Sequence, residues 1–154
     1  MVNIINKNLI KLNVEGIEKK EIIKELANLI YKENRLNDFE KYVESVLERE
    51  ESITTGIGFG IAIPHGKCKA VDVPTVAFGR VVSGVEWKSL DDHPVHVIFL
   101  LAVPEEAGSN QHLKILAALS RKLMDESFVA NLLNIEDEDA LLELLSKTFE
   151  KALL

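Results

Sequence analysis

The sequence predicts an α/β protein in which helices cover a central β-sheet. Three observations support this class: apolar residues at helical spacing near both ends of the chain, short β-branched and apolar runs in the middle, and an order of helices, strands, helices. The 154 residues suit one domain, 1–154, and show no repeat, linker or low-complexity segment.

The first third of the chain predicts two helices. Apolar residues recur every three or four positions over residues 18–33, which is typical of an amphipathic helix. Asn37, with Glu40 three residues later, resembles a capping box and predicts the start of a second helix. That helix should end near Arg49 or Glu50, where the pattern changes.

The middle third predicts short strands, and the last third predicts helices. Residues 61–63 read as a strand that leads into a turn at Pro64, and residues 75–82 as a second strand. Residues 95–103 are apolar at both alternate positions, so they should form a central strand covered on both faces. Three further helices are expected in "NQHLKILAALSRKLM", "DESFVANLL" and "DEDALLELLSKTF".

Composition narrows the function classes. A net charge of −7 without a long basic run argues against nucleic acid or an anionic membrane as the main partner. The longest apolar run, Val97–Val103, is far shorter than the roughly 20 residues of a membrane span. The N-terminus lacks a signal-peptide pattern, and Cys68 is the one cysteine, so we expect a cytoplasmic protein without disulfides.

The glycine-rich stretch "GIGFGIAIPHGK" does not fit a nucleotide-binding loop. The dinucleotide fingerprint requires a sixth-position glycine where this chain has Ile61, and no helix follows. A P-loop would need Gly-Lys followed by Ser or Thr, which is absent. The glycines are therefore expected to allow positive φ or close backbone packing.

His65 lies between Pro64 and Gly66, which constrain the backbone on both sides of the ring. Taken alone, it is either an ordinary loop histidine or a reactive one. A neutral imidazole is a good nucleophile near pH 7, because its ordinary pKa is about 6.5.

Other residues favour the reactive interpretation. His112 falls in the first turn of a predicted helix, with Ser109 or Asn110 as N-cap, where free N–H groups attract anions. Three cationic residues adjoin the glycine-rich segment: Arg49, Lys67 and Lys69. Such a set suits phosphoryl transfer without a metal or cofactor. This reaction depends on positioning and on hydrogen-bond donors for the negative charge distributed over the phosphoryl oxygens.

Two segments carry a resemblance to a known family. The stretch "EREESITTGIGFGIAIPHG" resembles the active-site signature of the fructose/mannitol-type IIA components of the bacterial phosphoenolpyruvate-dependent sugar phosphotransferase system. The stretch "GVEWKSLDDHPVHVIFLLAVPEEAGSNQHLKILAALSRKLM" is similar to the second half of these proteins, so the resemblance covers nearly the whole chain.

This resemblance implies a fold and a role for each motif residue. The fold would be a single domain with a mixed central sheet flanked by helices. His65 would accept the phosphoryl group from HPr as a tele-phosphohistidine, His112 would support that group, and Arg49 would help to hold its charge. The next acceptor would be a cysteine of a IIB component, and a membrane IIC component would pass the sugar.

The resemblance leaves the branch of the family open. No IIB or IIC segment is present in the sequence, so we expect a free-standing subunit. The segment 104–133 resembles fructose-type proteins most, whereas mannitol-type and nitrogen-regulatory IIA proteins share the same active-site block. A regulatory switch that moves no sugar is thus the main alternative.

The remaining candidates have simpler interpretations. His93 and His96 lack the spacing of a zinc site, and Cys68 is expected to be a spare loop residue. Trp87 should pack in the interior instead of binding sugar. Three apolar residues near the site belong either to the core or to a docking surface for the carrier protein: Ile57, Phe59 and Ile61.

Overall fold

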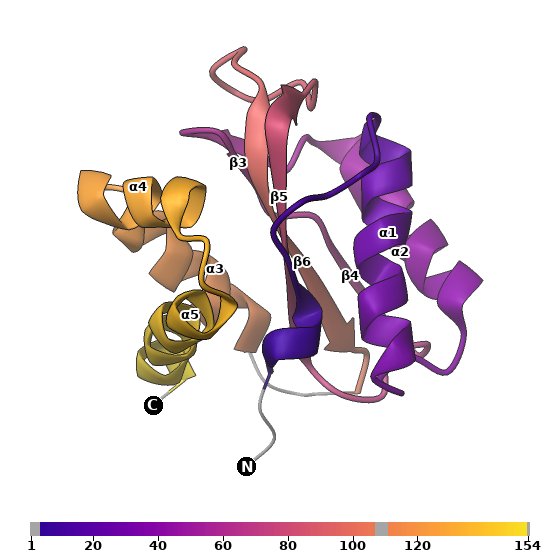
Figure 1. The fold of residues 1–154 in the computed structure, drawn as a ribbon. Coiled ribbons are helices and arrows are strands. Elements are labelled where there is room, and N and C mark those ends of the chain that lie inside the picture. The colour runs from indigo at the N-terminus through magenta and orange to yellow at the C-terminus, as the bar shows by residue number, and fades with distance from the viewer. Residues whose placement is uncertain (1–3, 107–110, 154) are drawn as a thin grey trace.

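The computed structural model describes residues 4–106 and 111–153, and for residues 111, 112 and 153 it describes the backbone alone. The elements form three layers, with helices on both sides of a β-sheet (Figure 1). The predicted α/β class with a mixed central sheet flanked by helices is confirmed.

The sheet has six strands among the described residues, in the order β1-β5-β6-β3-β2, and β4 also pairs with β6. The strands are β1 (Ile10–Lys11), β2 (Gly56–Gly58), β3 (Ile61–Ala62), β4 (His65–Cys68), β5 (Thr75–Val85) and β6 (Val95–Pro104). β5 runs antiparallel to β6, whereas β3 and β4 run parallel to it, so the sheet is mixed.

β6 is the central strand that its sequence predicts. All of its residues are buried except His96 and Pro104, which are partly buried. β5 pairs along one edge of β6, while β3 and then β4 pair along the other edge. Pro64 therefore interrupts a continuous run along β6, and the expected turn at this residue is wrong.

Helices α1 (Lys19–Lys32) and α2 (Phe39–Ser52) cover one face of the sheet (Figure 1). The predicted helix over residues 18–33 is confirmed, and α2 extends slightly beyond its predicted end. The expected cap at Asn37 is wrong, because Asp38 accepts the hydrogen bond from the Lys41 N–H at 3.2 Å. The Asn37 amide instead donates to the Asp72 carboxylate at 2.8 Å, a tertiary contact that local sequence does not reveal.

The opposite face is covered by α3 (Gln111–Lys122), α4 (Glu126–Asn134) and α5 (Glu138–Leu153), which confirms the three predicted helices (Figure 1). Three rings join this layer to the sheet. Phe78 and Phe99 meet edge to face with centroids 5.4 Å apart, and Phe99 meets Phe149 of α5 at 6.3 Å. Such aromatic contacts bury large apolar areas in a defined geometry.

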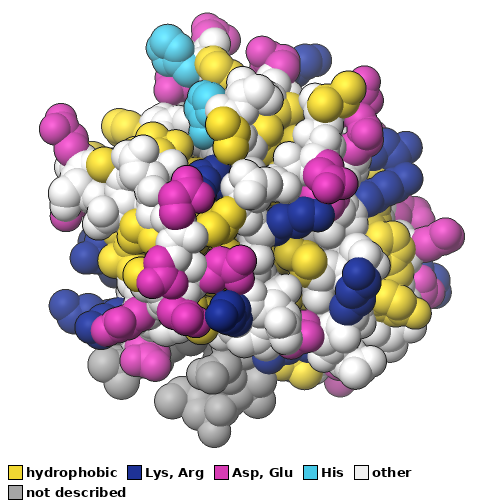
Figure 2. Space-filling model, in the orientation of Figure 1, with side chains coloured by type: hydrophobic (Ala, Val, Ile, Leu, Met, Phe, Trp, Pro, Cys, Tyr) yellow, Lys and Arg dark blue, Asp and Glu magenta, His cyan; other side chains and the backbone are white. Residues whose placement is uncertain are grey.

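On the visible face, acidic and basic side chains are interspersed among hydrophobic and uncharged ones (Figure 2). This mixture matches the moderate net charge of −7. Among the helices described, none has both the length and the hydropathy needed to span a bilayer.

Candidate functional site

His65 begins strand β4, directly opposite Leu101 of β6. The Leu101 N–H donates to the Pro64 carbonyl at 3.0 Å, and the Leu101 carbonyl accepts from the Tyr42 hydroxyl of α2 at 2.8 Å. The expectation that His65 is a loop residue is therefore wrong. Its backbone belongs to a sheet that α2 also holds, which restricts the motion of the ring.

The face of β4 that carries His65 follows from its neighbour Gly66. A Cβ on Gly66 would lie 2.9 Å from Val46 Cγ2 and 3.2 Å from Tyr42 Cε1, so this position faces α2 at very close range. Strand residues alternate between faces, so His65 and Lys67 face away from α2. They are turned to the side of the sheet on which α3–α5 lie (Figure 1).

One ring nitrogen of His65 has a fixed partner. Nδ1 lies 3.0 Å from the Ile63 carbonyl oxygen. A carbonyl oxygen only accepts hydrogen bonds, so Nδ1 of the neutral ring carries the proton and Nε2 carries the lone pair. The ring therefore presents Nε2 as its nucleophilic atom.

The surroundings of the ring favour its neutral form. Burial lowers the pKa of His65 below its ordinary value, and the positive charge of Arg49 acts in the same direction. The hydrogen bond to Ile63 and the negative charge of Glu50 oppose this shift of the pKa without reversing it. Near pH 7 the neutral, nucleophilic form of the ring therefore predominates.

Arg49 lies in the last turn of α2, and its Nη1 donates to the Ile53 carbonyl at 2.8 Å. This bond holds the guanidinium against the turn that follows the helix. An arginine has five N–H donors, so others remain for an anion. Because its charge affects the pKa of His65, Arg49 lies within electrostatic reach of the ring.

The second predicted histidine is only partly described. The backbone of α3 is described from Gln111 and begins on the sheet side to which His65 is turned (Figure 1). The side chain of His112 and the expected cap residues Ser109 and Asn110 lie outside the described residues. The role of His112 stays a prediction.

The two lysines differ in position. Lys67 lies within β4, two residues from His65 and on the same face, whereas Lys69 follows the end of the strand. Both are exposed, and among the described residues neither side chain has a hydrogen bond or ion pair. Lys67 thus places a positive charge on the same face of β4 as His65.

The family model described as "Phosphoenolpyruvate-dependent sugar phosphotransferase system, EIIA 2" matches residues 3–148. The chain belongs to this family. The resemblance stated from the sequence is therefore confirmed at the level of the family.

Two relatives of the chain are named as fructose-specific components. It is 42% identical over 147 residues to the PTS system fructose-specific EIIABC component of Bacillus subtilis, covering 96% of this chain and 23% of that protein. It is 40% identical over 142 residues to the PTS system fructose-specific EIIA component of Haloferax volcanii, covering 92% of each. The chain thus spans about a quarter of the first protein and nearly all of the second.

Two solved structures share the fold. The nitrogen regulatory protein IIA-Ntr of Neisseria meningitidis is 32% identical, with a TM-score of 0.84 over 92% of this chain and 96% of that one. The complex of IIAMTL and phosphorylated IIBMTL of Escherichia coli gives 26% identity and a TM-score of 0.78, over 93% and 97%. The EIIA family therefore includes sugar-named and regulatory members, and the fold alone does not separate them.

The remaining EIIA candidate residues have structural environments. Trp87 is fully buried, so the packing interpretation is confirmed. Ile61 belongs to the core, Ile57 packs against it partly buried, and Phe59 is 57% exposed. A docking role therefore remains a prediction, and of the three residues Phe59 is the most exposed. Within residues 4–106 and 111–153, no group of three His, Cys, Asp or Glu side chains could hold a metal ion.

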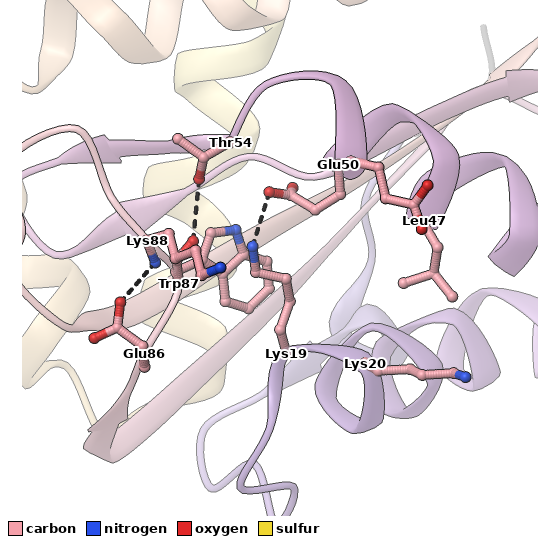
Figure 3. Close-up of a pocket in the computed structure, with 9 residues that line it drawn as sticks. Lys19, Lys20, Leu47, Glu50, Thr54, Glu86, Trp87 and Lys88 are labelled. Atoms are coloured by element: carbon pink, nitrogen blue, oxygen red, sulfur yellow. Dashed lines mark hydrogen bonds and ion pairs between the residues drawn. The ribbon is translucent and has the colours of Figure 1, made fainter.

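Sequence reasoning missed a buried carboxylate beside the site. Glu50 is 8% exposed and lies at the rim of a hollow of about 710 Å³ that Lys19, Thr54 and Trp87 also line (Figure 3). A signal was present in the sequence, because position 50 continues the apolar helical stripe of Val43 and Val46. A charged residue on the buried stripe of a helix requires a partner.

Proposed function

We propose that the chain is a IIA phosphoryl carrier that acts through His65. Nε2 accepts a phosphoryl group from phospho-HPr as a tele-phosphohistidine, and the group then passes to a IIB cysteine. A membrane IIC component and this IIB would phosphorylate the sugar during uptake. In this route the chain acts in the cytoplasm as one IIA unit, residues 1–154.

The observation that carries the proposal is the combination of two features at His65: Nδ1 lies 3.0 Å from the Ile63 carbonyl, and the positive charge of Arg49 acts on the ring. The Nε2 lone pair attacks phosphorus, a new N–P bond forms, and the bond to the donor breaks with its electron pair. The Nδ1 proton stays on the ring. In the second step the IIB thiolate attacks phosphorus and the Nε2 lone pair is restored.

Two further residues would stabilise the transferring group. The free guanidinium donors of Arg49 would hold the spread negative charge, and His112 in the first turn of α3 would support the phosphoryl oxygens. We expect His112→Ala to leave His65 modifiable but to slow the transfer. An unchanged single-turnover rate would exclude His112 from this role.

The names of the relatives favour fructose as the sugar. The two proteins matched at 42% and 40% identity are both named fructose-specific. A fructose-type IIB would therefore be the cognate acceptor. The IIAMTL complex with phosphorylated IIBMTL supports a IIB partner for the same fold.

A regulatory role is the second candidate. The IIA-Ntr structure matches this chain with a TM-score of 0.84, which exceeds the 0.78 of the IIAMTL complex. In that case the chemistry at His65 is unchanged, but its phosphorylation controls the binding of another protein and no sugar is moved. Mannitol-type transport is a third specificity that shares the same site.

Intact-mass analysis tests the carrier role. Wild type and His65→Ala are incubated with phosphoenolpyruvate, enzyme I and HPr. The phosphorylated wild type is then separated from these components and mixed with a fructose-type IIB. One acid-labile phosphoryl group on wild type alone, lost when IIB is added, is the expected result. Wild type that is folded but unmodified would overturn the proposal, and retention of the group with IIB present would favour the regulatory role.

A further inference from the structure

The buried carboxylate of Glu50 is fully engaged with polar partners. Its side chain is 4% exposed, and Oε2 lies 3.1 Å from Lys19 Nζ. The same oxygen accepts from the Thr55 N–H at 3.1 Å, and Oε1 accepts from the Thr55 hydroxyl. The carboxylate thus links α1, α2 and Thr55, which directly precedes the glycine-rich hairpin of β2 and β3.

Hydrogen bonds continue from Thr55 to the reactive ring. The Thr55 carbonyl accepts from the Ile63 N–H at 3.0 Å, and the Ile63 carbonyl lies 3.0 Å from Nδ1 of His65. Thr55 is 4% exposed and Ile63 is 3% exposed, so water does not compete for these bonds. Backbone hydrogen bonds through Thr55 and Ile63 therefore link the Glu50 carboxylate to the ring step by step.

The same carboxylate would be a poor choice for stability alone. Glu50 lies in the last turn of α2, which ends at Ser52, and a negative charge is unfavourable near a helix C-terminus. Burial of the charge adds a desolvation cost that a well-packed apolar residue would avoid. Packing alone therefore does not account for a carboxylate at this position.

Neighbouring groups hold the carboxylate in place (Figure 3). Trp87 Nε1 donates to the Thr55 hydroxyl at 3.2 Å, which leaves the hydroxyl proton directed to Glu50. Lys19 Nζ lies 5.0 Å from the centre of the Trp87 ring while it pairs with Glu50. Lys19 thus pairs with the carboxylate while its ammonium group lies over the Trp87 ring.

We infer that Glu50 is a positioning residue for His65: through Thr55 and Ile63 it fixes the carbonyl that holds the Nδ1 proton and so directs Nε2 outward. The inference rests on the proposed role of His65 as phosphoryl acceptor. Glu50 touches neither the ring nor the transferred group, so its effect reaches the reaction through the backbone.

The test compares Glu50→Gln with Glu51→Gln. The two substitutions remove the same charge from adjacent residues, but Glu51 is exposed and has no hydrogen bond or ion pair among the described residues. The tautomer and pKa of His65 are read from ring nitrogen shifts in ¹⁵N NMR. The single-turnover rate of phosphoryl acceptance from phospho-HPr is measured well above the pKa of His65, where every variant has a neutral ring.

We expect Glu50→Gln to slow acceptance about 10- to 100-fold, as a misdirected reactive group does. The neutral ring should become a mixture of Nδ1–H and Nε2–H forms. The pKa of His65 should also fall, because the negative charge that raises it is gone. Glu51→Gln should match wild type in rate and tautomer.

A folded Glu50→Gln with the wild-type rate and tautomer would overturn the inference. If Glu50→Gln does not fold, Glu50→Asp is measured instead, because it keeps the charge for Lys19 but draws the carboxylate away from Thr55. The same loss of rate and of a single tautomer is then expected, and wild-type behaviour would contradict it. The NMR readout needs no phosphoryl transfer, so a failure of the carrier role remains distinguishable from a failure of the positioning role.

Discussion

His65 and His96 each have Nδ1 next to a backbone carbonyl oxygen, but the surroundings of their Nε2 atoms differ. In His96, Nδ1 lies 3.1 Å from the Val81 carbonyl, much as His65 Nδ1 lies 3.0 Å from that of Ile63. A Cβ on Gly84 would lie 3.2 Å from Nε2 of His96, so the β5–β6 hairpin covers that nitrogen. No described residue bonds Nε2 of His65, and Arg49 lies within electrostatic reach of its ring.

The Nδ1 contact alone therefore does not distinguish His65 from His96. The two rings differ because Nε2 of His96 lies against Gly84 and because the positive charge of Arg49 acts on His65. His65 begins the short strand β4, which pairs with β6, whereas His96 lies in β6 itself, which pairs with β5, β3 and β4. The following predictions test this difference in order of decreasing effect.

The largest expected effect on phosphoryl acceptance comes from removing the His65 ring, in contrast to removing the His96 ring. His65→Ala should abolish phosphoryl acceptance, whereas His96→Ala should accept one group at close to the wild-type rate. Intact-mass analysis with phosphoenolpyruvate, enzyme I and HPr measures both. A phosphorylated His65→Ala protein, or an inactive but folded His96→Ala protein, would remove the distinction between the two histidines.

Arg49→Gln should slow phosphoryl acceptance about 100-fold, because the transition-state charge loses a donor. It should also raise the pKa of His65, since the positive charge of Arg49 lowers it. Quenched single-turnover reactions give the rate of phosphoryl acceptance, and NMR titration gives the pKa of His65. Arg121→Gln, on the distant end of α3, is the matched loss of charge and should change neither quantity.

Lys67→Gln should have a smaller effect, a decrease of about fivefold, which corresponds to roughly 1 kcal/mol of screened attraction. Lys69→Gln removes the same charge beyond the end of the strand and should have less effect. Single-turnover rates at low and high salt compare the two variants. Equal effects of both would show that net charge, not the face shared with His65, is responsible.

The smallest effect on phosphoryl transfer is expected at Gly84. Its φ is +81°, a conformation that alanine adopts at a cost of about 1–3 kcal/mol. The added methyl group would also press on the His96 ring. Gly84→Ala should therefore lower the thermal unfolding midpoint and leave the rate of acceptance by His65 unchanged. A loss of rate in the folded variant would link the two histidines.

The sequence predicts the helices and the central strand because their signals are local. Apolar residues at helical spacing mark α1 and the three C-terminal helices, and continuous apolar character marks β6. Strand β4 gives no such signal, because "HGKC" has no apolar alternation and exists through pairing with β6, more than thirty residues away. The local sequence alone therefore predicts a loop at His65.

The site likewise has residues that the local sequence reveals and contacts that it does not reveal. His65 and Arg49 can be found from the glycine-rich motif and its neighbouring charges. The Glu50–Thr55–Ile63 chain cannot, since it depends on how α2, the hairpin and β4 meet in space. The side chain of His112 lies outside the described residues, so its part in the site rests on the family resemblance.

The most direct measurement of the central claim is the position of the phosphoryl group on the ring. Wild-type protein phosphorylated through HPr is studied by ¹⁵N and ³¹P NMR. The account predicts a phosphorus bond to Nε2 of His65, with Nδ1 still protonated toward the Ile63 carbonyl. A phosphoryl group on Nδ1 of His65, or on another histidine, would contradict it.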